Sequence, residues 1–164
     1  MYVDQSSPVK RNERTGYYSA GESLWNTVYD DQIYRRSVDR LNWAIKNLES
    51  KIPGVRANAL NICARYYDYG WSVKEDSERS KRYLREAAEL GHGQACYDLA
   101  RSSLYLDGGL IDEAEAIIKV GLNHINDESF NCRKDDYVQK ELEVPLQQLL
   151  LVCKFKRDFL SRSS

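Results

Sequence analysis

Two stretches near the middle of the chain, NALNICARYYDYG (58–70) and QACYDLARSSLYLDGG (94–109), hold the pattern that decides the fold. They share four identities at one offset of 36 residues (95 minus 59, and likewise for the others), and the matched pairs are Ala59/Ala95, Ala64/Ala100, Arg65/Arg101 and Tyr69/Tyr105. A period in this range, with small residues at fixed places, is typical of helix pairs that stack into a solenoid. The repeat therefore predicts an all-α fold.

Apolar residues recur at helical spacing on both sides of the repeat. The pattern predicts helices over 31–50, 77–90, 94–106, 111–122 and 135–160. We expect Gly91 to end the second of these helices and Pro145 to kink or split the last one. The segment 135–160 would cover the open end of the solenoid as a C-terminal capping helix.

Composition narrows the class of protein. The 164 residues are 42% apolar and 30% charged, which is typical of a globular domain rather than a disordered chain. The net charge of −1 gives no global field that would favour nucleic acid or an anionic membrane. No apolar run approaches the roughly 20 residues of a membrane span. The polar N-terminus lacks the apolar core of a signal peptide, so we expect a cytoplasmic protein, or a periplasmic one if a signal peptide has been removed.

One unit of the repeat has a fixed order of small, aromatic and glycine positions. They are Ala59, Cys63-Ala64, Tyr67, Gly70-Trp71-Ser72-Val73, Asp76, Arg79-Ser80, Tyr83-Leu84, Ala87-Ala88 and Gly91. In this order and spacing the segment resembles the Sel1-like repeat, a relative of the tetratricopeptide repeat. It departs from the family pattern at four positions, which are Ala64, Ser72, Ser80 and Leu84. The unit 95–127 resembles the family more weakly, and the flanks 1–50 and 128–164 are not covered.

The resemblance implies an α-solenoid of antiparallel helix pairs. We expect 1–20 to be a flexible segment and 21–164 to form a single helical-repeat domain. The parts of that domain would be a degenerate repeat 21–56, the Sel1-like repeat 57–91, a degenerate repeat 92–127 and capping helices 128–164. The alanines of the repeats would let paired helices approach closely, so they belong to the fold rather than to function.

Members of the Sel1-like family are generally adaptors, so the resemblance implies a non-enzymatic module that binds a partner protein or peptide in a concave groove. The first helix of each unit would line that groove, which gives the candidate partner-binding residues Asn58, Asn61, Arg65, Asp68, Tyr69, Gln94, Tyr97, Arg101, Leu104 and Tyr105. Each recurring Arg-Tyr pair is spaced i, i+4 and therefore shares one helix face. Because a guanidinium matches a carboxylate, an acidic segment or a C-terminus fits such a groove.

Other interpretations stay open at this point. In one, Tyr69 and Tyr105 pack between repeats, and each arginine pairs with a local carboxylate such as Asp68. Trp71 either anchors the core or contacts a partner. A second function is also open, because short Sel1-like proteins serve in bacteria as immunity proteins that neutralise a secreted toxin. A small hydrolase is the third candidate.

Reactive side chains give little support for an enzyme. No P-loop, G-x-S-x-G, H-E-x-x-H or G-x-G-x-x-G motif occurs, so we assign no catalytic residue, cofactor or metal. We expect His92 to lie in a solvated turn and His124 to lie at a helix end, where the helix dipole favours its cation. The cysteines lack C-x-x-C spacing, and we expect four buried free thiols: Cys63, Cys96, Cys132 and Cys153.

A short basic cluster lies at the end of the chain, formed by Lys154, Lys156, Arg157 and Arg162. We expect a frayed, solvated terminus here. A docking patch is the alternative.

Overall fold

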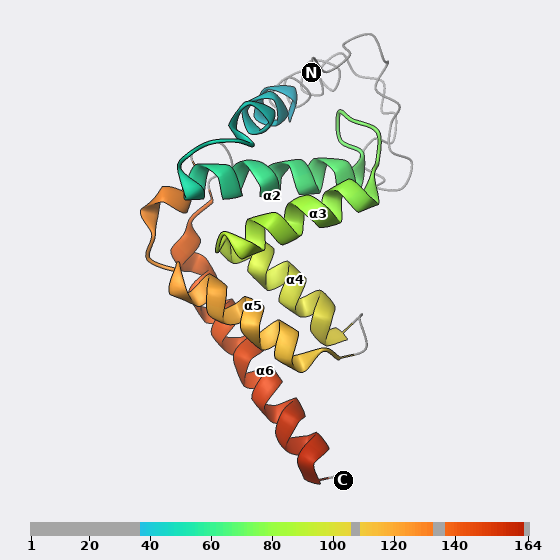
Figure 1. Ribbon diagram of the computed structural model, residues 1–164, viewed down its shortest axis with the longest axis vertical. Coiled ribbons are helices and arrows are strands. Elements are labelled where there is room, and N and C mark those ends of the chain that lie inside the picture. Colours follow the sequence, from blue (N-terminus) through green and yellow to red (C-terminus); the bar gives the residue numbers. More distant parts are fainter. Residues whose placement is uncertain (1–36, 106–108, 133–136, 163–164) are drawn as a thin grey trace, which may run out of the picture.

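The computed structural model describes residues 37–105, 109–132 and 137–162, and the chain is helical throughout most of them (Figure 1). Residues 37–47 are helical, and the elements that follow are α2 (Pro53–Tyr69), α3 (Ser77–Glu89), α4 (Gly93–Tyr105), α5 (Ile111–Asn123), the 3-10 turns η1 (Glu128–Phe130) and η2 (Gln139–Leu142), and α6 (Glu143–Arg162). The only β-type pairing within these residues is an isolated bridge between Cys132 and Tyr137. The all-α prediction is confirmed. The segment expected to be flexible, 1–20, lies outside the described residues.

Local sequence explains where several helices begin and end. Pro53 occupies the first turn of α2, where its missing N–H costs nothing, and Gly70 ends that helix with a left-handed φ of 65°. Asp76 caps α3 by accepting a hydrogen bond from the Arg79 backbone N–H. Gly91 follows the end of α3 with a φ of 93°, as the sequence predicted.

The prediction for Pro145 was wrong. The sequence indicated one long helix over 135–160 that this proline would kink or split. Instead α6 begins at Glu143, so Pro145 falls in the first turn, where no intrahelical partner is lost. The preceding residues form η2 instead of α-helix, and 135–136 lie outside the described residues. The helix continues to Arg162, so the basic cluster is helical rather than frayed. Lys154, Arg157 and Arg162 are nevertheless exposed, as expected of a solvated segment.

Each helix packs against its neighbours in the chain. α2 contacts α3, α4 contacts α5, α3 contacts both α4 and α5, and α6 lies against α4 and α5. The alanines of the two repeat units are buried, as predicted, and include Ala59, Ala64, Ala95 and Ala100. Four free cysteines are buried as well, which confirms the prediction of buried thiols.

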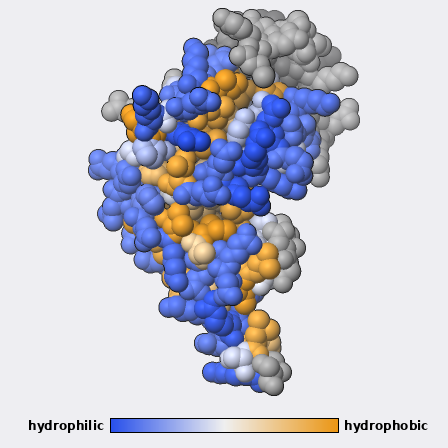
Figure 2. Space-filling model, in the orientation of Figure 1, coloured by the Kyte–Doolittle hydropathy of each residue, from blue (hydrophilic) through white to orange (hydrophobic). Residues whose placement is uncertain are grey.

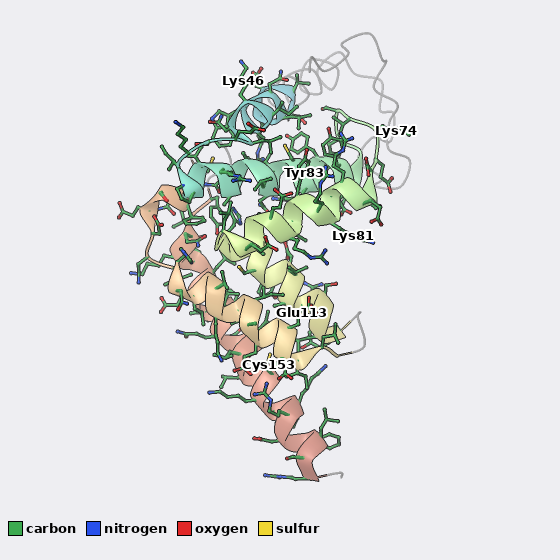
Figure 3. All side chains as sticks on the ribbon, viewed as in Figure 1. Lys46, Lys74, Lys81, Tyr83, Glu113 and Cys153 are labelled. Atoms are coloured by element: carbon green, nitrogen blue, oxygen red, sulfur yellow. The ribbon has the colours of Figure 1, made fainter. Side chains whose placement is uncertain are left out.

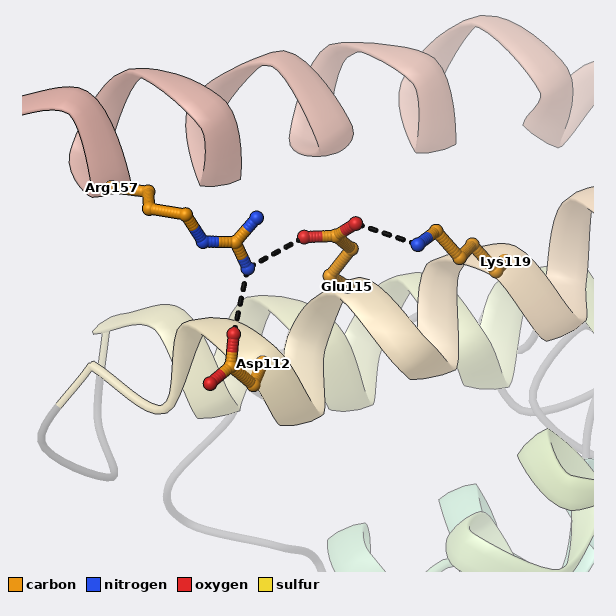
Figure 4. Close-up of polar contacts among 4 residues, drawn as sticks. All are labelled: Asp112, Glu115, Lys119 and Arg157. Carbon is orange, nitrogen blue, oxygen red and sulfur yellow. Dashed lines mark hydrogen bonds and ion pairs between the residues drawn. The ribbon is translucent and has the colours of Figure 1, made fainter.

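An arginine fixes α6 to α5 (Figure 4). Arg157 donates a hydrogen bond to Asp112 and forms an ion pair with Glu115, at 2.7 Å each, and Glu115 also pairs with Lys119 one turn further along α5. Both acids lie in the N-terminal half of α5, and the guanidinium bridges them from the neighbouring helix. The network joins the C-terminal half of α6 to the N-terminal half of α5, and it occupies one of the four cations of the basic cluster.

The turn between α3 and α4 is buried, and this overturns the expectation of a solvated His92. The His92 side chain is completely buried and stacks on the Tyr137 ring at a centroid distance of 4.3 Å. Its Nδ1 accepts a hydrogen bond from the Ala95 backbone N–H, so its Nε2 carries the proton and donates to Asn58 Oδ1 at 2.9 Å. Asn58 in turn donates to the Phe130 carbonyl. The histidine thus joins α4 to α2 and to η1.

Gln139 holds the same turn from the other side. Its Nε2 donates to the Gly91 carbonyl at 2.6 Å and to the His124 carbonyl at 3.3 Å, while its Oε1 accepts from the Gly93 N–H at 2.9 Å and from the Tyr137 hydroxyl. The side chain is almost completely buried. Because a buried polar group is costly without partners, this amide ties η2 to the α3–α4 turn and to the end of α5.

Replacing Gln139 with alanine is expected to lower the free energy of unfolding by about 3 kcal/mol, because the Gly91 carbonyl and the Gly93 N–H lose their buried partner. Urea unfolding measures the change. The control is Gln147→Ala, which removes an exposed amide on α6 and should change stability by no more than about 0.5 kcal/mol. Equal effects of the two substitutions would contradict the role of Gln139.

His92 also predicts a pH dependence. Burial first, and then the charge of Arg65, lowers the pKa of His92 from 6.5 to about 3. The unfolded chain therefore binds a proton at His92 between pH 6.5 and about 3 that the folded chain does not, and stability falls as the pH drops through this window. From pH 7.5 to pH 5, the free energy of unfolding should fall by about 2 kcal/mol.

Urea unfolding at the two pH values tests this. The His92→Gln variant should be less stable than the wild type at neutral pH. From pH 7.5 to pH 5, its free energy of unfolding should fall by about 2 kcal/mol less than that of the wild type. A variant whose pH dependence matched that of the wild type would show that another group is responsible.

Candidate functional site

The predicted partner-binding residues fall into two sets. The larger set is exposed or half-exposed: Arg65, Asp68 and Tyr69 on α2, with Gln94, Tyr97, Arg101 and Tyr105 on α4. The smaller set is buried: Asn58 and Asn61 are each 2% exposed and Leu104 is 1% exposed. Only the larger set is positioned to meet a partner.

The buried set corrects the sequence prediction, which placed these three residues on an open groove. Asn58 lies on the same face of α2 as Arg65, but η1 and His92 pack over the N-terminal end of this face, where Asn58 lies. The contact is so close at Gly54 that an added Cβ would lie 2.3 Å from the Ser129 backbone. Leu104 is buried for another reason, since its side chain belongs to the main hydrophobic core.

Asp98 is a site residue that the sequence prediction missed. It lies on α4 between Gln94 and Arg101 on one helix face, at spacings of four and three residues. Gln94 Nε2 donates to Asp98 Oδ1 at 3.0 Å. Burial raises the pKa of Asp98, while that hydrogen bond and the charges of Arg65 and Arg101 act in the opposite direction. The spacing alone could have placed Asp98 on this face.

Arg65 of α2 and Arg101 of α4 both lie near enough to Asp98 for their charges to lower its pKa. Both guanidinium groups act on a single half-buried carboxylate, although 36 residues separate them in the sequence. Neither has a carboxylate within ion-pair distance in the part of the chain that the structure describes. The local pairing of each arginine with an acid such as Asp68, which the sequence left open, is therefore not seen. We call this surface, formed by Arg65, Gln94, Asp98, Arg101 and Tyr105, the arginine face.

A third cation borders the arginine face at the far end of α4. Lys156 of α6 lies over the Tyr105 ring at 4.7 Å and donates to the Leu104 carbonyl at 2.8 Å. The Tyr105 side chain is nevertheless 56% exposed. The surface thus combines positive charge with a partly exposed aromatic ring, a combination that is enriched where proteins bind one another.

Aromatic rings also gather at the end of α2. Tyr69 stacks on Trp71 with centroids 4.8 Å apart, and Trp71 meets the buried Tyr66 edge to face at 5.8 Å. Tyr69 is 43% exposed and Trp71 is 38% exposed. Trp71 therefore both anchors on the core and presents part of its surface to solvent.

His92, Cys63 and Cys96 are buried side chains outside the arginine face. His92 is buried with both ring nitrogens engaged. Burial raises the pKa of Cys63 and of Cys96 to about 12, which keeps both thiols protonated and weakly nucleophilic. No cluster of three potential metal ligands occurs among the described residues.

A search for membrane-crossing segments among the described helices found none with the required length and apolar character. Comparison with family models, with curated proteins and with solved structures found no match to the chain.

Asp98→Asn is expected to stabilise the fold by about 0.5 kcal/mol at neutral pH. Burial raises the pKa of the Asp98 carboxyl, so at a pH above its pKa in the unfolded chain the charged form lowers the stability of the fold. Asparagine keeps the hydrogen bond from Gln94 without the charge. Urea unfolding at pH 7 measures the effect, with the exposed Asp39→Asn as the control. If Asp98→Asn proved destabilising, the Asp98 carboxylate would stabilise the fold through the arginines instead of lowering its stability through burial.

Proposed function

We propose that the chain is a non-enzymatic protein-interaction module of the Sel1-like solenoid kind. The helices of the two units support this arrangement, because α2 and α4 end at the matched residues Tyr69 and Tyr105, and α3 and α5 are 13 residues long in each unit. In this arrangement α2 with α3 and α4 with α5 are antiparallel pairs, and α6 covers the end of the stack. The first helices of the pairs then supply the binding surface.

The ligand that best fits the arginine face is an acidic segment of a partner protein. One observation supports this proposal above all: the charges of Arg65 and Arg101 both act on the half-buried Asp98, and neither arginine has an ion-pair partner among the described residues. Two guanidinium groups beside one carboxylate leave a net positive charge. A carboxylate of the partner would accept paired hydrogen bonds from a guanidinium, and Tyr105 would contribute aromatic contact area.

The test is a selection of peptides from a random displayed library. The wild-type chain should enrich peptides rich in aspartate and glutamate. The variant with Arg65→Glu and Arg101→Glu should lose this enrichment, and calorimetry should show at least a hundredfold weaker binding of a selected peptide, because two desolvated charge contacts become repulsive.

The matched control reverses one exposed arginine on α3, by Arg85→Glu. It should leave the selected sequences and their affinities unchanged. If the double variant folded like the wild type by circular dichroism and still selected acidic peptides, the arginine face would not be the binding surface.

A further inference from the structure

The outer side of α6 has a long apolar stripe. Val144, Leu151 and Phe155 are 59%, 64% and 73% exposed, and Phe159, at 62%, lies one turn further along. At 100° per residue these positions fall within about 80° around the helix. They lie opposite the side that buries Leu146, Leu149 and Cys153 against α4 and α5.

The end of α6 also extends beyond the other helices. Figure 1 shows its last turns projecting past the end of α5, and Figure 2 shows an apolar area toward this end of the molecule. Such a stripe is larger than the scattered apolar residues of an ordinary surface, and such patches mark contact sites.

Two charges of opposite sign border one side of this stripe. Lys154 and Asp158 are four residues apart on α6, so they lie on the same flank. Neither has an ion-pair partner within the described residues, in contrast to Lys156 and Arg157, which are engaged inside the chain. The basic cluster therefore divides into cations that hold α6 in place and cations that remain available.

We propose that the α6 stripe binds the α6 stripe of a second copy of this chain, antiparallel and centred on Phe155. A two-fold axis through this point sets Phe155 against its own copy and Leu151 against the partner's Phe159, because these positions lie four residues on either side of the centre. An antiparallel two-fold pair also brings the same flank of both helices together. Lys154 then lies within about 3 Å, along the axis, of the level of the partner's Asp158.

The antiparallel arrangement thus places Lys154 of each copy near Asp158 of the other. Each dimer contains two reciprocal Lys154–Asp158 pairs at the border of an apolar contact, and a border of complementary charge selects orientation. The stripe is smaller than the roughly 800 Å² per partner of a standard stable interface, so the dimer has a dissociation constant in the micromolar range or weaker.

Sedimentation equilibrium of the full chain, from micromolar to millimolar concentration, tests the proposal. The wild type should show a reversible monomer–dimer equilibrium, and Phe155→Glu should abolish it by placing two carboxylates at the centre. Phe155 is exposed, so this variant should keep the helical circular dichroism of the wild type.

Charge reversal tests the orientation. Lys154→Asp alone and Asp158→Lys alone should each weaken dimerisation about tenfold. The chain with both substitutions should return to within about threefold of the wild type, because the reciprocal pairs are rebuilt. Lys46→Asp is the matched control, since Figure 3 places this lysine at the opposite end of the molecule from α6, and it should leave the equilibrium unchanged.

A chain that stayed monomeric at every concentration, or a dimer unaffected by Phe155→Glu, would overturn the proposal. Failure of the double reversal to restore dimerisation would overturn the antiparallel packing. A monomer that co-sedimented with phosphatidylserine vesicles, and lost this binding on Phe155→Glu, would assign the stripe to a membrane surface instead. Arg65→Glu with Arg101→Glu should still dimerise, so this test is independent of the arginine face.

Discussion

The buried turn at 91–93 is where the separate parts of this chain meet. Asn58 reaches it from α2, Gln139 from η2, and the end of α5 supplies the His124 carbonyl. These contacts are polar and almost free of solvent, so each donor and acceptor must find its partner in one arrangement. A hydrophobic core alone would tolerate small shifts of one helix along another, and this network does not.

The same network determines which part of the repeat surface is left open. Because Asn58 is engaged with His92 and with the Phe130 carbonyl, η1 covers the first half of the α2 face. Arg65 lies beyond that cover and reaches the neighbourhood of Asp98. The segment that contains η1 therefore limits the open part of this surface to the arginine face.

The two surfaces proposed for binding differ in the kind of interaction that they offer a partner. The arginine face combines a half-buried carboxylate with two arginines whose charges act on it, and it therefore favours a charged ligand. The α6 stripe is apolar, and its charges lie at the border, where they select orientation more than they add affinity. The buried cysteines and His92 belong to neither surface. Burial holds the Cys63 and Cys96 thiols protonated and the His92 imidazole neutral, so these groups act as part of the core.

Periodicity in the sequence determined the helical class, the buried alanines and the approximate bounds of α3, α4 and α5, because these follow from residues close together in the chain. It also placed Arg65 and Arg101 on exposed helix faces. Only the tertiary structure decided that Asn58 and His92 are buried, since the segment that covers them lies about 40 to 70 residues further along and has no repeat pattern. Pro145 lies in a first turn because the residues before Glu143 form η2 instead of a continuous α-helix. Local spacing sets a helix and its faces, whereas long-range polar contacts decide which faces remain in solvent.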